Sequence, residues 1–316
     1  AGVALTILGV VFTPTILQWM GTPTDVLPQS ISYFRFYFCG AVFTVMYNIF
    51  VGILHAVGDS RHPLYYLICS SMVNVVLDLV LVAVLKLGVG AAAIATTISQ
   101  GISAALCCIR LVRFETPYQL KLKEVRFHKQ SLLEIVRYGL PSGIQNSVIA
   151  IANVVVQTNI NAFGEQAMAG CGSYSKIEGF AFLPITCFTQ ALATFVGQNL
   201  GAKKYDRVKK GVAFGLICAC GMAEIIGVLS YLFAPQLISI FNQNPDVIGY
   251  GVRHMQTICL WYFLLAFSHC IAAILRGAGK ASIPMITMLV CWCLIRVTYI
   301  TVALRYVNQL ETVSAA

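Results

Sequence analysis

The sequence contains few charged residues. Only 10% of its 316 residues are charged, 12 of them acidic and 21 basic, whereas an ordinary soluble domain is about 25% charged. So few charges cannot solvate the surface of a folded chain of this size, which excludes an ordinary soluble enzyme. Apolar residues instead make up 58% of the chain, and the mean hydropathy is +0.80. This balance is typical of a protein that lies in lipid.

Signatures of catalysis and of metal binding are also missing. The sequence has no Walker A motif, no nucleophile elbow and no HExxH. Its twelve cysteines form no CxxC pair and lie almost entirely in apolar stretches, where they behave as small apolar residues. The five histidines are scattered singly. We therefore predict that the chain is not an enzyme and carries no cofactor.

The apolar residues are grouped in long blocks. A membrane-spanning helix needs about 20 such residues, because unpaired backbone groups are very costly in hydrocarbon. Nine blocks meet this requirement, and no strand-like alternation occurs. They are residues 2–19, 31–57, 63–85, 88–109, 138–161, 167–197, 211–233, 247–275 and 283–304. The sequence thus predicts an all-α integral membrane protein with about nine transmembrane helices.

Basic residues are concentrated in alternate loops. Most of them lie near Arg61, in 110–137, in 203–210 and in 276–280, whereas the loops near 20–30, 162–166 and 234–246 contain none. Such asymmetry is the positive-inside pattern, and it predicts that the basic loops are cytoplasmic. The net charge of +9 is therefore explained by membrane orientation, and we expect no nucleic-acid partner.

The second half of the chain repeats the first. At an offset of 221 residues, GILHAVGDSRHPL (52–64) aligns with AILRGAGKASIPM (273–285), and Gly58 and Pro63 fall on Gly279 and Pro284. Repeats in the same orientation imply two lobes related by an axis along the membrane normal. We expect an N-lobe at 1–114 with spans 3–6, a cytoplasmic linker at 115–130 and a C-lobe at 131–316 with spans 7–11 of an inferred twelve. The chain would then be truncated at both ends.

One carboxylate lies deep in an apolar block. Asp78 follows Ser70 and Asn74 at intervals of four residues, so the three polar side chains share one helical face. An ionised carboxylate at the centre of a span costs about 2.5–3.5 kcal/mol, and a proton or a hard cation would neutralise it. We interpret Asp78 as an ion-coupling group. The alternative is that it pairs with another polar group and only stabilises helix packing.

Further polar residues lie in the fifth and sixth blocks. The fifth block carries Asn146, Asn153 and Gln157 at helical spacing, and the sixth carries Lys176 and Glu178. These five residues are candidates for lining a substrate cavity. Lys176 and Glu178 could equally pair with other groups and be inert. Two intramembrane arginines, Arg35 and Arg296, are expected to snorkel to the membrane surface.

Several phrases resemble those of the MATE (multidrug and toxic compound extrusion) family. They are GILHAVGDSRHPL (52–64), NVVLDLVLV (74–82), GVGAAAIATTISQ (88–100), YGLPSGIQN (138–146), FVGQNLGAKKYDR (195–207) and ILRGAGKASIP (274–284). They occur in family order over nearly the whole chain. The segment KIEGFAFLP (176–184) is most similar to the bacterial branch related to DinF.

The resemblance implies an antiporter that exports drugs or other toxic compounds in exchange for H⁺ or Na⁺ by alternating access between two lobes. It also implies a cation site, with Na⁺ as one candidate ion, at Asn74, Asp78 and Thr96. We expect cationic amphipathic substrates, a monomer and a location in the bacterial inner membrane. The alternative within the same superfamily is a flippase for a lipid-linked precursor, whose cavity would be rich in Arg and Lys.

Overall fold

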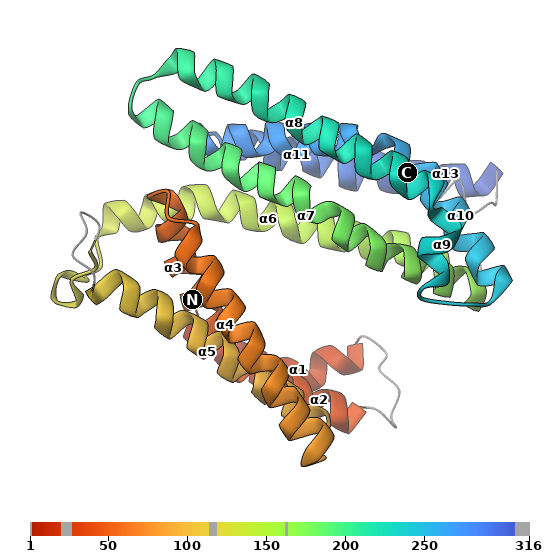
Figure 1. Ribbon diagram of the computed structural model, residues 1–316, viewed down its shortest axis with the longest axis horizontal. Coiled ribbons are helices and arrows are strands. Elements are labelled where there is room, and N and C mark those ends of the chain that lie inside the picture. The colour runs from red at the N-terminus through yellow and green to blue at the C-terminus, as the bar shows by residue number, and fades with distance from the viewer. Residues whose placement is uncertain (1, 20–26, 114–118, 162–163, 307–316) are drawn as a thin grey trace. The chain divides into compact units, whose positions relative to one another are not determined.

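The structure is a computed structural model that describes residues 2–19, 27–113, 119–161 and 164–306 (Figure 1). These residues form helices and connecting turns, and no strand occurs among them. Contacts divide the chain into two compact units, Ala1–Arg126 and Phe127–Ala316.

Unit 1 is built around one central helix. Its elements are α1 (Gly2–Trp19), α2 (Leu27–Cys39), α3 (Ala41–Ala56), α4 (Arg61–Asp78), the π-helical segment η1 (Leu79–Val84), α5 (Val89–Arg113) and the short 3₁₀ turn η2 (Leu122–Glu124). Helix α5 packs against α2, α3 and α4. Its buried face consists largely of small residues such as Ala93, Ala95 and Ser103, and small residues let helix backbones approach closely in a membrane.

Unit 2 is built around the long helix α7. Its elements are α6 (Lys129–Asn161), α7 (Glu165–Gly201), α8 (Tyr205–Leu232), α9 (Ala234–Ser239), α10 (Pro245–Ile258), the 3₁₀ turn η3 (Cys259–Trp261), α11 (Tyr262–Gly277), α12 (Ser282–Met288), the π-helical segment η4 (Leu289–Ile295) and α13 (Arg296–Tyr306). Helix α7 packs against α8, α10 and α11, and Figure 1 shows α7 and α8 running side by side.

Seven helical stretches of the described chain are long and apolar enough to cross a membrane. They are Arg61–Val84, Val89–Arg113, Lys129–Ile160, Glu165–Gly201, Tyr205–Leu232, Pro245–Gly277 and Ser282–Val302. Each coincides with one of the nine blocks expected from the sequence. Their outer faces carry exposed apolar side chains such as Phe180 and Ile217, both 72% exposed. These helices are those of a multi-pass membrane protein.

The other two blocks differ from single straight spans. The block at 31–57 is a pair of helices, α2 and α3, bent by 42°. The bend lies at Gly40, where a Cβ atom would collide with the Thr97 side chain of α5. The block at 2–19 is α1, which is apolar but shorter than the seven spans. An apolar run alone does not reveal such a break, because its composition continues across it.

The internal repeat is visible in the backbone. The bounds of α3 and α11 differ by the same offset of 221 residues. Each helix is followed, two residues after its end, by a glycine in the left-handed region, Gly58 with φ 86° and Gly279 with φ 78°. In each turn the glycine N–H donates to a carbonyl three residues back, at 3.0 Å, and the next N–H donates five residues back, at 2.9 Å. This is the Schellman pattern of helix termination, and it occurs in both units.

Candidate functional site

The candidate coupling residues lie on two neighbouring helices of unit 1. Asp78 is the last residue of α4 and directly precedes the π-helical segment η1. Such π-helical segments occur frequently at functional sites. Asn74 lies one turn earlier on α4, and Thr96 lies on α5. Asn74, Asp78 and Thr96 are all half-buried.

A hydrogen bond between two serines sets the register of α4 against α5. The Ser103 hydroxyl of α5 donates to the Ser70 hydroxyl of α4, which in turn donates to the Leu67 carbonyl. From this contact, Asp78 lies eight residues along α4 and Thr96 seven residues back along α5. At 1.5 Å per residue these steps are about 12 Å and about 10.5 Å. Because the connection between the helices is short and they run antiparallel, Asp78 and Thr96 lie at similar depths.

Three polar atoms in this region are buried without a hydrogen-bond partner. They are Asn74 Nδ2, Asp78 Oδ1 and Gln100 Oε1. Gln100 was not among the residues singled out from the sequence. It follows Thr96 by four residues on α5, so its helical spacing was the signal that could have identified it. An unsatisfied buried polar atom is costly, and a cation or a proton would relieve that cost at an oxygen.

The oxygen atoms present suit a hard monovalent cation or a proton. Asp78 forms no ion pair within 4 Å in the described part of the chain. The Thr96 hydroxyl donates to the Ala92 carbonyl at 3.0 Å, which leaves its lone pairs free to accept or coordinate. Among the described residues no group of three or more His, Cys, Asp or Glu side chains could hold a metal ion. A site here would therefore depend on one carboxylate with neutral oxygens.

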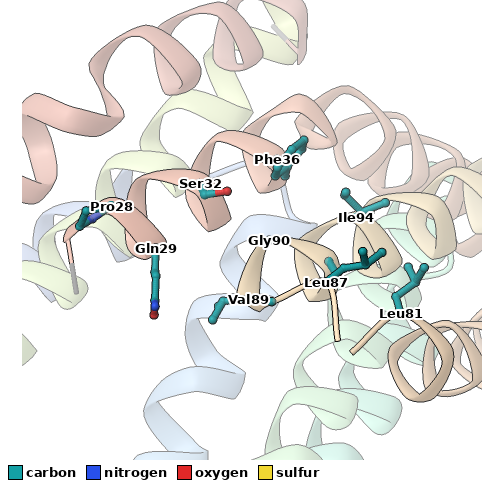
Figure 2. Close-up of a pocket in the computed structure, with 11 residues that line it drawn as sticks. Pro28, Gln29, Ser32, Phe36, Leu81, Leu87, Val89, Gly90 and Ile94 are labelled. Carbon is teal, nitrogen blue, oxygen red and sulfur yellow. The ribbon is translucent and has the colours of Figure 1, made fainter. Parts of the chain in front are cut away.

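A cavity of about 480 Å³ lies near this region of unit 1 (Figure 2). Figure 2 shows Pro28, Gln29, Ser32 and Phe36 along α2, and Val89, Gly90 and Ile94 at the start of α5. The cavity is also lined by Leu81 of η1, three residues after Asp78. Most of the lining is apolar, and Gln29 and Ser32 contribute polar side chains. Its size lies within the range of small-molecule sites, about 300–1,000 Å³.

The candidate substrate residues of unit 2 are not all brought together. Asn146, Asn153 and Gln157 lie on α6 and are exposed. Lys176 and Glu178 lie on α7 but point to different neighbours. The Lys176 ammonium lies 5.3 Å from the centre of the Phe241 ring, whereas Glu178 lines a second cavity.

This second cavity has a volume of about 630 Å³. It is lined by Glu178 of α7, residues of α10, η3 and α11, and residues of η4 with Arg296. The Glu178 Oε1 accepts a hydrogen bond from the Tyr174 hydroxyl at 2.9 Å, and that hydroxyl lies 3.2 Å from the hydroxyl of Tyr262. The carboxyl group of Glu178 is thus held by Tyr174, and not by Lys176.

Arg296 lies in the wall of this cavity. Its guanidinium carbon lies 4.8 Å from the centre of the Trp292 ring, and its Nη1 donates to Asn153 Oδ1 at 3.2 Å. The sequence had suggested that Arg296 snorkels to the membrane surface. The structure instead places it half-buried beside Trp292 and α6. The position of Arg296 relative to the end of its span could not reveal this placement, because the direction of the side chain depends on the neighbouring helices.

Comparison with known proteins identifies the family. The model of the MatE family matches residues 1–80 and 141–301. The chain belongs to the MATE family. The sequence-based assignment is therefore confirmed at the level of the family, and its placement in the DinF-like branch stays a prediction.

Curated MATE relatives resemble the chain over most of its length. Probable multidrug resistance protein YoeA of Bacillus subtilis is 28% identical over 92% of this chain and 65% of its own length. Probable multidrug resistance protein YpnP of the same organism is 25% identical over 95% of this chain and 67% of its own length. The chain thus spans about two thirds of the relatives it matches.

Solved MATE structures share its fold. A MOP superfamily transporter from Pyrococcus furiosus has a TM-score of 0.93, with 22% sequence identity, over 99% of this chain and 71% of the other. At this level of identity the likeness shows the fold alone.

Proposed function

We propose that this MATE chain is part of an ion-coupled antiporter that exports small organic compounds in exchange for H⁺ or Na⁺. Family membership and the relatives described as multidrug resistance proteins support the transport of small molecules. The observation that carries the coupling proposal is the Asp78 carboxyl, which has a buried oxygen without a partner on a membrane-spanning helix.

The proposed mechanism depends on the charge state of Asp78. Two lobes, residues 1–114 and 131–316 joined by the linker 115–130, alternate between inward-open and outward-open states. A bound ion shifts this equilibrium only by its different affinity for the two states. Binding of H⁺ or Na⁺ at Asp78, with Asn74 and Thr96 beside it, removes the cost of a buried negative charge in one of them. One elementary charge moved across 100 mV supplies about 2.3 kcal/mol.

The basic loops lie in the cytoplasm and the protein in the bacterial inner membrane, since positive residues accumulate on the cytoplasmic side. The protein works as a monomer, and its substrates are cationic amphipathic compounds. No resident cofactor is required, because the ion gradient supplies the energy.

The test is transport by the full-length protein in proteoliposomes, with pH and Na⁺ gradients imposed separately. We expect drug efflux to respond to one of the two gradients and to fall at least tenfold in Asp78→Asn. Asp206→Asn, an exposed acid in the first turn of α8, is the matched control and should transport as the parent does. Unchanged gradient-driven efflux in Asp78→Asn would reject the coupling role.

The flippase alternative is not favoured. A cavity for a lipid-linked pyrophosphate needs several Arg and Lys side chains. The cavity of unit 2 is lined by Arg296 as its one basic residue within the described chain, beside the acidic Glu178. The curated relatives reported above carry multidrug resistance names.

A further inference from the structure

The cavity of unit 2 combines aromatic walls with two opposite charges. Trp261, Tyr262 and Trp292 are the aromatic residues of its lining, and Glu178 and Arg296 are the charged ones. Its volume of about 630 Å³ falls within the usual range for drug-sized ligands. Aromatic walls with few polar groups are typical of sites that bind organic molecules.

The position of Arg296 follows from the π-helical segment that precedes it. A π-helix closes its hydrogen bonds over five residues, so residues four and five apart share a face. Trp292 and Cys291 lie four and five residues before Arg296, and all three line the cavity. The indole of this segment and the guanidinium of the residue that follows it are therefore presented to the same space.

The positive charge of Arg296 has no carboxylate at close range among the described residues, although Glu178 of the same cavity attracts it from farther away. No acidic side chain lies within 4 Å of its guanidinium in the described part of the chain. Its Nη1 donates to the neutral amide of Asn153, and its buried Nε has no hydrogen-bond partner. A charge in this environment is costly unless a partner compensates it. A carboxylate can accept two parallel hydrogen bonds from one edge of a guanidinium.

Glu178 faces the same cavity but is held elsewhere. Its Oε1 accepts a hydrogen bond from the Tyr174 hydroxyl, so a neutral hydroxyl group and not Arg296 provides its close contact. When ionised, Glu178 repels an anion and attracts a cation in the cavity. It is therefore a selectivity group that acts opposite to Arg296.

We propose that this cavity binds aromatic organic anions, whose carboxylate pairs with Arg296 and whose ring lies among the indoles of Trp261 and Trp292. The proposal adds an anionic ligand class to the cationic substrates of the transporter proposed above, and it rests on that function for its biological role. The binding itself needs no transport. The proposed ligands are anions and not the expected cations, because the group with an unsatisfied hydrogen-bond donor is the positively charged guanidinium of Arg296.

The test is equilibrium binding of radiolabelled 2-naphthoate to the purified full-length protein, with 2-naphthylmethylammonium as the cationic probe and 2-naphthamide as the neutral one. We expect Arg296→Gln to weaken naphthoate binding at least tenfold and to leave naphthamide binding unchanged. Glu178→Gln should strengthen the binding of naphthoate several-fold and weaken the binding of 2-naphthylmethylammonium. Arg207→Gln, which alters an exposed basic residue outside the cavity, should alter none of the three.

The opposite shifts distinguish recognition from misfolding, because a misfolded variant would lose all three probes together. Should that occur in Arg296→Gln, Arg296→Lys keeps the charge and should retain partial naphthoate binding. Equal naphthoate affinity in the parent and in a folded Arg296→Gln overturns the proposal. Displacement of naphthoate by phosphatidylglycerol but not by excess benzoate would assign the site to a lipid headgroup and would also overturn it. A failure of ion-driven export leaves these binding results untouched.

Discussion

Gly58 and Gly279 lie 221 positions apart and hold the same left-handed backbone conformation, with φ of 86° and 78°. Each terminates an equivalent helix, α3 or α11, and each is followed by a proline that is buried, Pro63 or Pro284. The repeat detected in the amino-acid sequence is thus also a repeat of turn geometry.

These two turns predict the effect of adding a methyl group. Gly58→Ala and Gly279→Ala should each lower the free energy of unfolding by about 1–2 kcal/mol, because an L-residue is strained in the left-handed region. Thermal unfolding of the purified protein in detergent measures the loss. Gly52→Ala is the control, since this glycine is inside helix α3 and a Cβ there meets open space. A Gly58→Ala variant as stable as the parent would contradict the prediction.

A second glycine effect should arise from close helix packing. A Cβ atom on Gly227 of α8 would collide with the Cys259 carbonyl oxygen, a backbone atom that cannot turn away. We expect Gly227→Ala to destabilise the protein by about 1–3 kcal/mol, the usual cost of overpacking. Gly221→Ala, on the same helix with open space around it, should cause little change. The melting temperatures of the two variants provide the comparison, and equal values would argue against tight packing of α8 on η3.

The turn between α3 and α4 predicts a dependence on acid. The His62 Nδ1 lies 2.8 Å from both Asp59 carboxylate oxygens, and Arg110 Nη2 lies 3.8 Å from one of them. Burial by itself raises the pKa of Asp59, but the hydrogen bonds from His62 and the charges of His62 and Arg110 outweigh burial, so this pKa is lowered. The stabilisation is complete above the unfolded pKa of about 3.9 and is lost as the pH falls through the folded value.

Asp59→Asn should therefore be less stable than the parent at pH 7, and this difference should shrink below about pH 4. Melting temperatures recorded from pH 7 to pH 3 test this expectation. Glu134→Gln, at an exposed position of α6, should show no such convergence with the parent. A constant difference across the whole range would show that the Asp59 charge is not the cause.

The serine pair between α4 and α5 predicts a small coupling energy. Hydrogen bonds between membrane helices contribute about 0.6 kcal/mol on average. A double-mutant cycle with Ser70→Ala and Ser103→Ala should give a coupling near this value, because each hydroxyl is buried and engages the other. Ser71→Ala, next to Ser70 but exposed, should not couple to Ser103→Ala. Additive effects of the first pair would contradict the hydrogen bond.

Much of the fold could be predicted from the sequence. Seven of the nine apolar blocks coincide with membrane-length helices, because hydrocarbon requires long apolar runs with all backbone bonds internal. The bend at Gly40 could not be predicted, since it depends on contact with Thr97 of another helix. The family was also recognisable, because the motifs at 52–64 and 274–284 lie in turns with demanding backbone geometry.

The candidate sites were less predictable. Asp78 stands out because a carboxylate in an apolar run is costly in lipid wherever it points. Gln100 did not stand out, since a neutral amide in a span has ordinary explanations, and Arg296 was expected to snorkel because arginines near span ends commonly do. Lys176 and Glu178 are two residues apart on α7 and contact different partners, so their proximity in the chain did not imply a shared cavity.

The amino-acid sequence was enough to identify a helical membrane protein of the MATE family with an internal repeat. It also identified Asp78, a carboxylate that is energetically unfavourable in a membrane span. Packing of the helices then established which polar side chains meet, placing Arg296 beside Trp292 and bringing Ser70 against Ser103. The physical reason lies in the solvent. In water an apolar stripe reveals the inner face of a helix, whereas in lipid both faces are apolar, so the inward face becomes known only from the neighbouring helices.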